Sequence, residues 1–302
     1  MSRTHIGVIT DSPHSPTVPS LRQALHDRGY LDGINVAVEY RYFNTKYDRL
    51  SSLASELVSL NVDVIAALGA EVAKAVKQAT TAIPIVFAMV PDAVAAGVVT
   101  NLAHPGGNIT GFSTFDPERS RMQMRLLKDV LPGLPGVAII GDQRVAGLWD
   151  ETETAAREFR LRPRLLKLQA HRLDLPGALD AATKDGADAL LALPHPLIGH
   201  HAREIARLAA DRHLATLFSG APEIATGQWG GLLAHGATLA DAARRVPSYI
   251  DQILRGTAPG NLPVIQGASA RLIVNQQTAR QLGITIPPAV LVRAERVIHC
   301  EP

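Results

Sequence analysis

The chain has 302 residues, a length typical of about two domains, and 46% of its residues are hydrophobic while 19% are charged. This composition supplies packed cores and excludes an intrinsically disordered chain. The net charge of +2 is too small for a nucleic-acid-binding protein, whose basic side chains gather on one face. No apolar run approaches the about 20 residues that cross a bilayer, and the single cysteine, Cys300, permits no intrachain disulfide.

Apolar runs alternate with helical patterns along the first third of the chain. The spacing of apolar residues predicts strands at residues 5–10, 35–43, 62–68, 85–89 and 109–112. Helices are expected at about 19–28, from Asp48 to Leu60, from Gly69 onward and, as a short piece, at 93–99. Such alternation predicts a parallel, doubly wound sheet.

The same alternation begins again after residue 113. Strands are predicted at residues 137–140, 164–168, 187–193, 215–218, 231–234 and 272–275. Helices are predicted from Asp116 or Pro117, at 152–159, 176–184, after Pro196, at 239–255 and at 276–282, with a turn and short helix at 286–297. We therefore predict an α/β protein of two doubly wound parallel-sheet lobes, residues 1–113 with 237–264 and residues 114–236 with 265–302.

Polar residues follow most of the predicted strands. In parallel sheets, ligands bind beyond the carboxyl ends of the strands, and two lobes without a long linker usually hold a ligand cleft that closes by hinge motion. The candidate ligand-binding residues of the first lobe are Ser12, His14, Ser15, Gly69, Ala70, Asp92, Ser113 and Thr114. Those of the second lobe are Asp142, Trp149, His195, Ser219 and His235.

Several segments carry a resemblance to a known family. They are residues 21–41, 48–69 and 272–298, and most distinctively AVKQATTAIPIVFAMVPDAVAAGVVTNLAHPGGNITGFS at 75–113. The chain resembles ABC-transporter substrate-binding proteins whose better-known members bind tryptophan and related amino acids, and which are similar in fold to type I periplasmic binding proteins. The resemblance implies hinge strands, a monomer, a small-molecule solute, an ABC permease with its ATPase as partner, and a periplasmic or lipid-anchored location.

The chain departs from the usual pattern of that family at four loops. Gly-Thr-Pro is replaced by Gly69-Ala70-Glu71, and Asp-Pro is replaced by Asp92-Ala93, which keeps the acid. An aromatic-Asn pair is replaced by Gly141-Asp142, and Tyr-Gly is replaced by His235-Gly236. The first replacement removes a hydroxyl that can bind a carboxylate.

Each first-lobe candidate also has a purely structural interpretation. Asp92 either binds a ligand's ammonium group or caps the helix that follows it. Ser12, His14 and Ser15 suit a carboxylate but equally form an ordinary Ser/Pro turn. Glu71 is stabilised at a helix N-terminus without any ligand. Ser113 and Thr114 can bond the backbone instead of a solute.

The second lobe leaves similar alternatives open. His195 and His235 each follow a strand and could line a cleft, while Trp149 could stack on a ring or pack in a core. Adjacent His200 and His201 cannot share a helix face, so we expect no metal.

No catalytic motif is present, and we expect neither an enzyme nor a cofactor. The N-terminus enters its first strand without a signal-peptide apolar region. A cytosolic ligand sensor of the same bilobal fold is therefore the alternative to a solute-binding protein.

Overall fold

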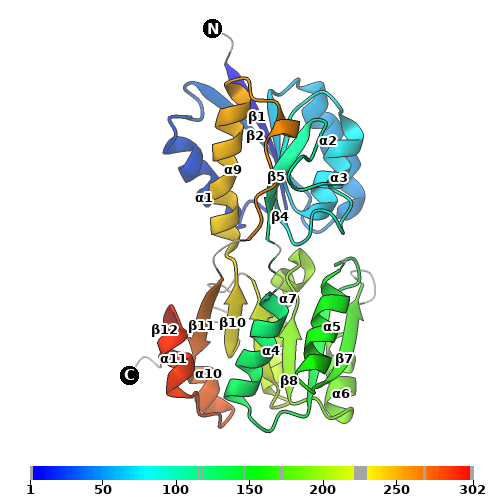
Figure 1. Ribbon diagram of the computed structural model, residues 1–302, viewed down its shortest axis with the longest axis vertical. Helices are drawn as coiled ribbons and strands as arrows, with labels where there is room; N and C mark the ends of the chain where they lie inside the picture. Colours follow the sequence, from blue (N-terminus) through cyan, green and yellow to red (C-terminus); the bar gives the residue numbers. More distant parts are fainter. Residues whose placement is uncertain are drawn as a thin grey trace. The chain divides into compact units, whose positions relative to one another are not determined.

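The computed structural model describes residues 3–114, 116, 118–145, 147–169, 173–220, 230–267 and 270–299, with only the backbone of Leu239 (Figure 1). It divides into two compact units, Met1–Asp116 with Leu239–Ala268 and Pro117–Thr238 with Ser269–Pro302. We call them the first and the second unit. The corresponding boundaries predicted from the sequence are residues 113, 236 and 264. Cys300 and Pro117 lie outside the described residues.

The first unit is built on a five-stranded parallel sheet in the part of the chain that the structure describes. Its strands are β1 (Thr4–Thr10), β2 (Val36–Tyr42), β3 (Val64–Leu68), β4 (Ile85–Val90) and β5 (Ile109–Ser113). They lie in the order β2-β1-β3-β4-β5. Strands β1, β3 and β4 carry apolar side chains on both faces, so their runs are nearly continuous in sequence, whereas the edge strand β2 alternates.

Helices cover both faces of this sheet (Figure 1). One face carries α1 (Thr17–His26) and α9 (Leu239–Leu254), which pack their apolar side chains on Val8 and Ala66. The other face carries α2 (Leu50–Ser59) and α3 (Ala70–Ala79). Two short 3-10 helices, η1 (Tyr47–Arg49) and η2 (Pro259–Asn261), complete the unit.

The second unit has a seven-stranded sheet among the described residues. Its strands are β6 (Gly136–Asp142), β7 (Arg162–Leu168), β8 (Ala189–Ala192), β9 (Ala215–Ser219), β10 (Leu233–Gly236), β11 (Arg271–Asn275) and β12 (Arg296–Ile298). Their order is β12-β11-β10-β9-β8-β6-β7, and only the β10–β11 pair is antiparallel in it. The prediction of two α/β lobes built on parallel sheets is confirmed, with this one reversed pairing as a difference.

Two helical layers enclose the second sheet. The first consists of α4 (Arg119–Val130), α5 (Leu148–Glu158), α10 (Gln276–Gln281) and α11 (Pro288–Arg293). The second consists of α6 (Leu175–Lys184) and α7 (Pro196–Ala210). Among the described residues, each unit therefore has two apolar clusters of its own, one on each face of its sheet.

Three local predictions are wrong. Residues 93–99 form turns rather than a helix, because the N–H groups of Val98 and Val99 both return to the Ala93 carbonyl. The apolar spacing of Leu50, Leu53 and Leu57 predicts that Leu60 is buried with them, but Leu60 is 44% exposed, since α2 ends at Ser59. The tail at 286–297 contains not only α11 but also the start of strand β12, which pairs with β11.

Candidate functional site

The first unit brings its predicted residues to one edge of its sheet. Strands β1, β3, β4 and β5 are adjacent and parallel, so the residues at their carboxyl ends share that edge. We call this set the first-unit edge; it consists of Ser12, His14, Ser15, Gly69, Ala70, Asp92, Ser113 and Thr114.

The turn after β1 is held by its own hydroxyl groups. Ser12 Oγ accepts a hydrogen bond from the His14 N–H at 3.2 Å, and the Ser15 hydroxyl bonds Thr17 Oγ1 at 2.8 Å. The His14 side chain is exposed, and Pro16 takes the N-cap position of α1 without a side-chain cap. These bonds support the turn interpretation, and a solute contact by Ser12, His14 or Ser15 stays a prediction.

Gly69 connects β3 to α3 in a conformation that favours glycine. Its φ of 121° lies where a side chain is strained, and its N–H donates to the Ala88 carbonyl at 2.9 Å. Gly69 is the N-cap of α3 and makes no side-chain cap, while Glu71 lies in the first turn. The backbone N–H groups at this helix start, beginning with Ala70, carry a partial positive charge.

Asp92 caps the turn that replaces the predicted helix. Its Oδ1 accepts hydrogen bonds from the N–H groups of Val94 at 2.9 Å and Ala95 at 3.0 Å. Nearby, the Ser113 hydroxyl donates to the Pro91 carbonyl at 3.0 Å, and the Thr114 N–H donates to Val90 at 2.8 Å. The side chains of Asp92 and Ser113 therefore both bond the backbone, and an ammonium contact by Asp92 stays a prediction.

The second unit also gathers predicted residues at one edge. Strands β10, β9, β8 and β6 are adjacent and parallel, and the second-unit edge, as we call it, consists of Asp142, His195, Ser219 and His235. Trp149 lies on α5.

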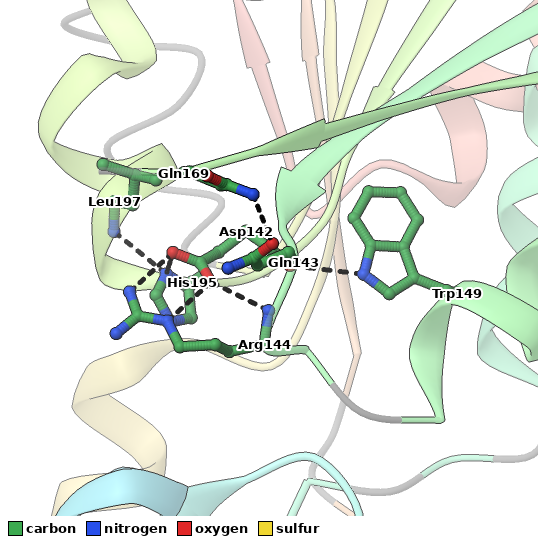
Figure 2. A network of polar contacts seen from close by, with 7 residues as sticks. All are labelled: Asp142, Gln143, Arg144, Trp149, Gln169, His195 and Leu197. Carbon is green, nitrogen blue, oxygen red and sulfur yellow. Dashed lines mark hydrogen bonds and ion pairs between the residues drawn. The ribbon is translucent and has the colours of Figure 1, made fainter. Parts of the chain in front are cut away.

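Asp142 is the centre of a polar network at this edge (Figure 2). Its side chain is 1% exposed, and its two oxygens accept hydrogen bonds from Arg144 Nε at 2.8 Å and Nη2 at 2.6 Å. The Arg144 backbone N–H adds a third bond at 2.9 Å. The guanidinium thus forms a bidentate ion pair with Asp142, and the Arg144 side chain remains 32% exposed.

His195 faces the same carboxylate from the start of α7. Its Nδ1 lies 3.6 Å from Asp142 Oδ2 and accepts the N–H of Leu197 at 3.2 Å, which caps α7. A neutral imidazole that accepts this bond carries its proton on Nε2. Protonation of Nδ1 would exchange the helix cap for an ion pair with Asp142.

The charge state of Asp142 follows from these contacts. Burial by itself raises the pKa of the Asp142 carboxyl. Hydrogen bonds from the Arg144 side chain and backbone outweigh burial, and together with the positive charge of Arg144 they hold the pKa of Asp142 below its ordinary value. Asp142 is therefore an anion that orients Arg144.

Trp149 lies on the other side of Asp142 from Arg144 and His195 (Figure 2). Its Nε1 donates to the Asp142 carbonyl at 3.2 Å, and the ring is 5% exposed within the apolar cluster of α4 and α5. The Lys167 ammonium lies 5.4 Å from the ring centroid. These contacts favour the core-packing interpretation of Trp149, and stacking on a solute stays a prediction.

Ser219 and His235 are joined through a residue of α4. Gln123 Nε2 donates to Ser219 Oγ at 2.9 Å and to the His235 carbonyl at 3.0 Å, and all three residues are buried. Gln123 therefore ties α4 to the carboxyl ends of β9 and β10, and it fixes the position of the Ser219 hydroxyl.

Comparison with known proteins identifies the family. The family model of the ABC transporter substrate binding proteins matches residues 8–298, nearly the whole chain. The chain belongs to this family.

Individual relatives agree with this assignment. A tyrosine-binding protein of Clostridioides difficile (strain R20291) is 35% identical over 118 residues, which are 39% of this chain and 34% of that protein. The alignment thus spans about a third of the relative's length. A conserved domain protein from Vibrio cholerae O1 biovar El Tor has a TM-score of 0.89 at 26% identity, covering 98% of this chain and 100% of the other.

A further solved structure shows the same fold. An ABC domain from Streptococcus pneumonia, solved in complex with L-Trp, has a TM-score of 0.90 at 22% identity, with 98% of this chain and 100% of that chain covered. The predicted family and fold class are confirmed by these matches.

Two polar residues of this substrate-binding protein were missed in the sequence. The Asp-x-Arg spacing after the β6 pattern was the available signal for Arg144, because a side chain two residues after a strand can turn back on its last residue. Nothing local pointed to Gln123, which lies inside the helix α4 and meets its partners only through packing.

Two further features of the substrate-binding protein concern its described residues alone. In them, no group of three or more His, Cys, Asp or Glu side chains is placed to hold a metal ion. The helices that the structure describes also include none with the length and apolarity needed to cross a membrane.

Proposed function

We propose that this chain is the solute-binding component of an ABC importer and captures a small carboxylate-bearing solute, an amino acid or a related metabolite, between its two units. Its partners would be an ABC permease and the ATPase of that permease, and it would act as a monomer outside the cytoplasm. Membership of the substrate-binding family supports this role.

One observation carries the proposal. In each unit, polar residues lie at the carboxyl ends of four adjacent parallel strands, where solutes of such sheets bind. Both units supply groups that suit the two ends of an amino acid. Asp92 at the first-unit edge is an acid for an ammonium group, and Arg144 beside the second-unit edge is a planar cation for a carboxylate.

Capture would proceed by hinge closure. A solute that touches both edges stabilises the closed arrangement over the open one, and the shift equals its difference in affinity for the two states. Asp142 takes part indirectly, because it holds Arg144 in place. A solute carboxylate would also meet the partial positive charge at the start of α3.

The solute class is proposed from two relatives. One is a tyrosine-binding protein and the other was solved with L-Trp, so these two amino acids head the panel of probes. The panel also contains the other standard L-amino acids, benzoate, short aliphatic carboxylates and the amide of each acid.

Isothermal titration calorimetry and thermal unfolding with this panel test the proposal. We expect at least one carboxylate to bind once per chain and to raise the melting temperature, while its amide binds more weakly. Mass spectrometry of small molecules released from the denatured protein gives an independent identification of the solute. Failure of every probe to bind or to raise the melting temperature, with no solute released, would reject the proposal.

A further inference from the structure

Met89 has a backbone conformation that is unusual for its side chain. Its φ is +61°, in the left-handed region, where a Cβ atom is strained. Other described residues with a side chain and a positive φ lie in turns; they are Asn44, Thr45, Asn61, Arg160 and His213. Met89 instead lies inside strand β4.

The strain belongs to a β-bulge between β4 and β5. Phe87 pairs with Gly111 and Val90 pairs with Ser113, so Ala88 and Met89 together oppose the single residue Phe112. Such two-for-one bulges change the direction of a side chain and are frequent beside functional sites.

The bulge moves Met89 from one face of the sheet to the other. In an unbroken strand Met89 would share a face with Phe87, two residues before it. In the structure, Ala88 and Met89 both pack on the apolar cluster of α1 and α9, while Val90 joins Phe87 in the cluster of α2 and α3. Two neighbouring residues of one strand thus point to the same side.

The backbone of the bulge does not require a methionine. A Cβ atom on Gly111 would overlap the backbone of Phe87, so the close approach of β4 and β5 depends on that glycine. At position 89, a glycine would adopt the same φ without strain. A strained side chain at the end of a strand points to a role for that side chain.

The position of Met89 suggests what it contacts. Met89 is half-buried, and the preceding carbonyl, that of Ala88, accepts the N–H of Gly69 at the first-unit edge. Asp92 of the same edge follows three residues later. A thioether is flexible and polarisable, and it makes favourable contacts with aromatic rings.

We propose that Met89 is a specificity-determining residue that contacts the aromatic or apolar side group of the solute. This role rests on the proposed function above. The proposed solutes are then carboxylates that carry an aromatic or apolar side group. Met89 contacts that side group, while the polar residues of the two edges bind the charged groups of the solute.

Three variants test the role: Met89→Gly, Met89→Ala and Met89→Leu. The probe is whichever of L-tryptophan, L-tyrosine, L-phenylalanine and L-leucine binds the wild type best in calorimetry. We expect the Gly and Ala variants to lose roughly 10-fold in affinity, because the apolar contact is removed. The Leu variant keeps the bulk and should stay within about 3-fold.

A stability measurement tests the strain without any solute. Met89→Gly should melt at or above the temperature of Met89→Ala, since only glycine relieves the left-handed conformation. The matched controls are Arg160→Gly and Arg160→Ala, at an exposed turn residue with φ +58°. They should give the same order of melting temperatures and leave affinity for the probe unchanged.

Each outcome decides the inference. Folded Gly and Ala variants with weakened binding, together with the expected melting order, support it. Folded variants that bind as tightly as the wild type reject the role of Met89 while the proposed function stands. A Met89→Ala variant that melts above Met89→Gly also rejects it, because the conformation is then not strained. A wild type that binds nothing in the whole panel and releases no solute on denaturation rejects the proposed function and this inference with it.

Discussion

The Arg144 side chain is held in one orientation by its neighbour Asp142. Two hydrogen bonds to Asp142 fix the plane of its guanidinium, and a backbone bond fixes the turn that carries it. A guanidinium held in this way loses little side-chain entropy when it meets a carboxylate. The Asp142 carboxylate, which orients the guanidinium, therefore contributes to the carboxylate binding that we propose for Arg144.

Replacing Arg144 by glutamine should weaken solute binding. A hydrogen bond to a charged group is worth about 1.5–3 kcal/mol, so we expect an affinity loss of roughly 10- to 100-fold for the solute acid. The affinity for the corresponding amide should change little. Calorimetry measures both. The control is Arg164→Gln, whose exposed arginine pairs with Asp185 on the surface. Equal losses for acid and amide would contradict a contact between Arg144 and the carboxylate.

Asp142→Asn tests the buried anion through its pH dependence. The pKa of Asp142 is lowered in the folded protein, so its contribution is fully present above the ordinary carboxyl pKa of about 3.9 and is lost as pH falls below it. At pH 7 we expect the variant to lose about 2 kcal/mol in free energy of unfolding. The difference from wild type should shrink below about pH 4.

Urea unfolding between pH 3 and pH 7 measures this difference, within roughly the range where carboxylates titrate. Asp185→Asn is the matched control, because its carboxylate pairs with an arginine on the exposed surface. It should cost much less, since exposed ion pairs contribute little. A pH-independent gap between wild type and Asp142→Asn would contradict the predicted role of the anion.

At the scale of elements, α9 joins the first unit across a long stretch of sequence. Tyr30 lies in the loop after α1, and its hydroxyl donates a hydrogen bond to Asp251 Oδ1 on α9 at 2.8 Å. Burial, the hydrogen bond to Asp251 and the charge of Asp251 raise the pKa of Tyr30 to about 12. This bond links the first helix of the chain to a helix that starts more than two hundred residues later.

Tyr30→Phe should remove this link. Because the folded pKa is raised, the contribution of Tyr30 is fully present below its ordinary pKa of about 10 and is lost as pH rises toward 12. At neutral pH we expect a loss of about 1 kcal/mol in free energy of unfolding, which disappears over that alkaline range.

Chemical unfolding at neutral and alkaline pH measures the effect of Tyr30→Phe. Tyr42→Phe serves as the control, since the ring of Tyr42 stacks on Tyr40 and leaves Tyr30 in place. It should retain the alkaline loss of the wild type. A Tyr30→Phe protein whose stability falls as steeply as the wild type between pH 10 and pH 12 would contradict the assignment.

Most helices and strands could be predicted from the sequence, because their formation depends on the spacing of apolar residues within each segment. Strands β1, β3 and β4 are buried on both faces and therefore appear as apolar runs, and parallel order then places their carboxyl ends together. The edges of both sheets could be expected for this reason. The bulge at Met89 could not, since it depends on Gly111 in another strand.

The remaining misses also depend on distant partners or on a single turn. Strand β12 has only three residues and exists because β11 is available for pairing. Residues 93–99 carry apolar residues suited to a helix, but Gly97 with φ +70° ends the turn early. The sequence prediction does not include Arg144, because it assigns Asp142 to the solute rather than to the neighbouring arginine.

At the scale of the whole molecule, each unit has the parts of an independent domain. In the part of the chain that the structure describes, each has one sheet, helices on both faces and two apolar clusters assembled from its own segments. Both units are nevertheless discontinuous in sequence, so the chain passes between them more than once. Such multiple connections suit a hinge, which requires two rigid bodies and a few residues that absorb the motion.

Scanning calorimetry tests whether a solute engages both units. Without solute we expect two transitions, one for each unit, because each has its own core. At a free concentration 100 times the dissociation constant, a solute stabilises what it binds by about 2.7 kcal/mol, or roughly 5–10 °C for a unit of this size. Capture between the units predicts that the melting temperatures of both transitions rise together or that the transitions merge.

The control is the amide of the solute at the same concentration, which should raise the two melting temperatures less. A solute that raises only one transition would bind a single unit, and closure around it would be excluded.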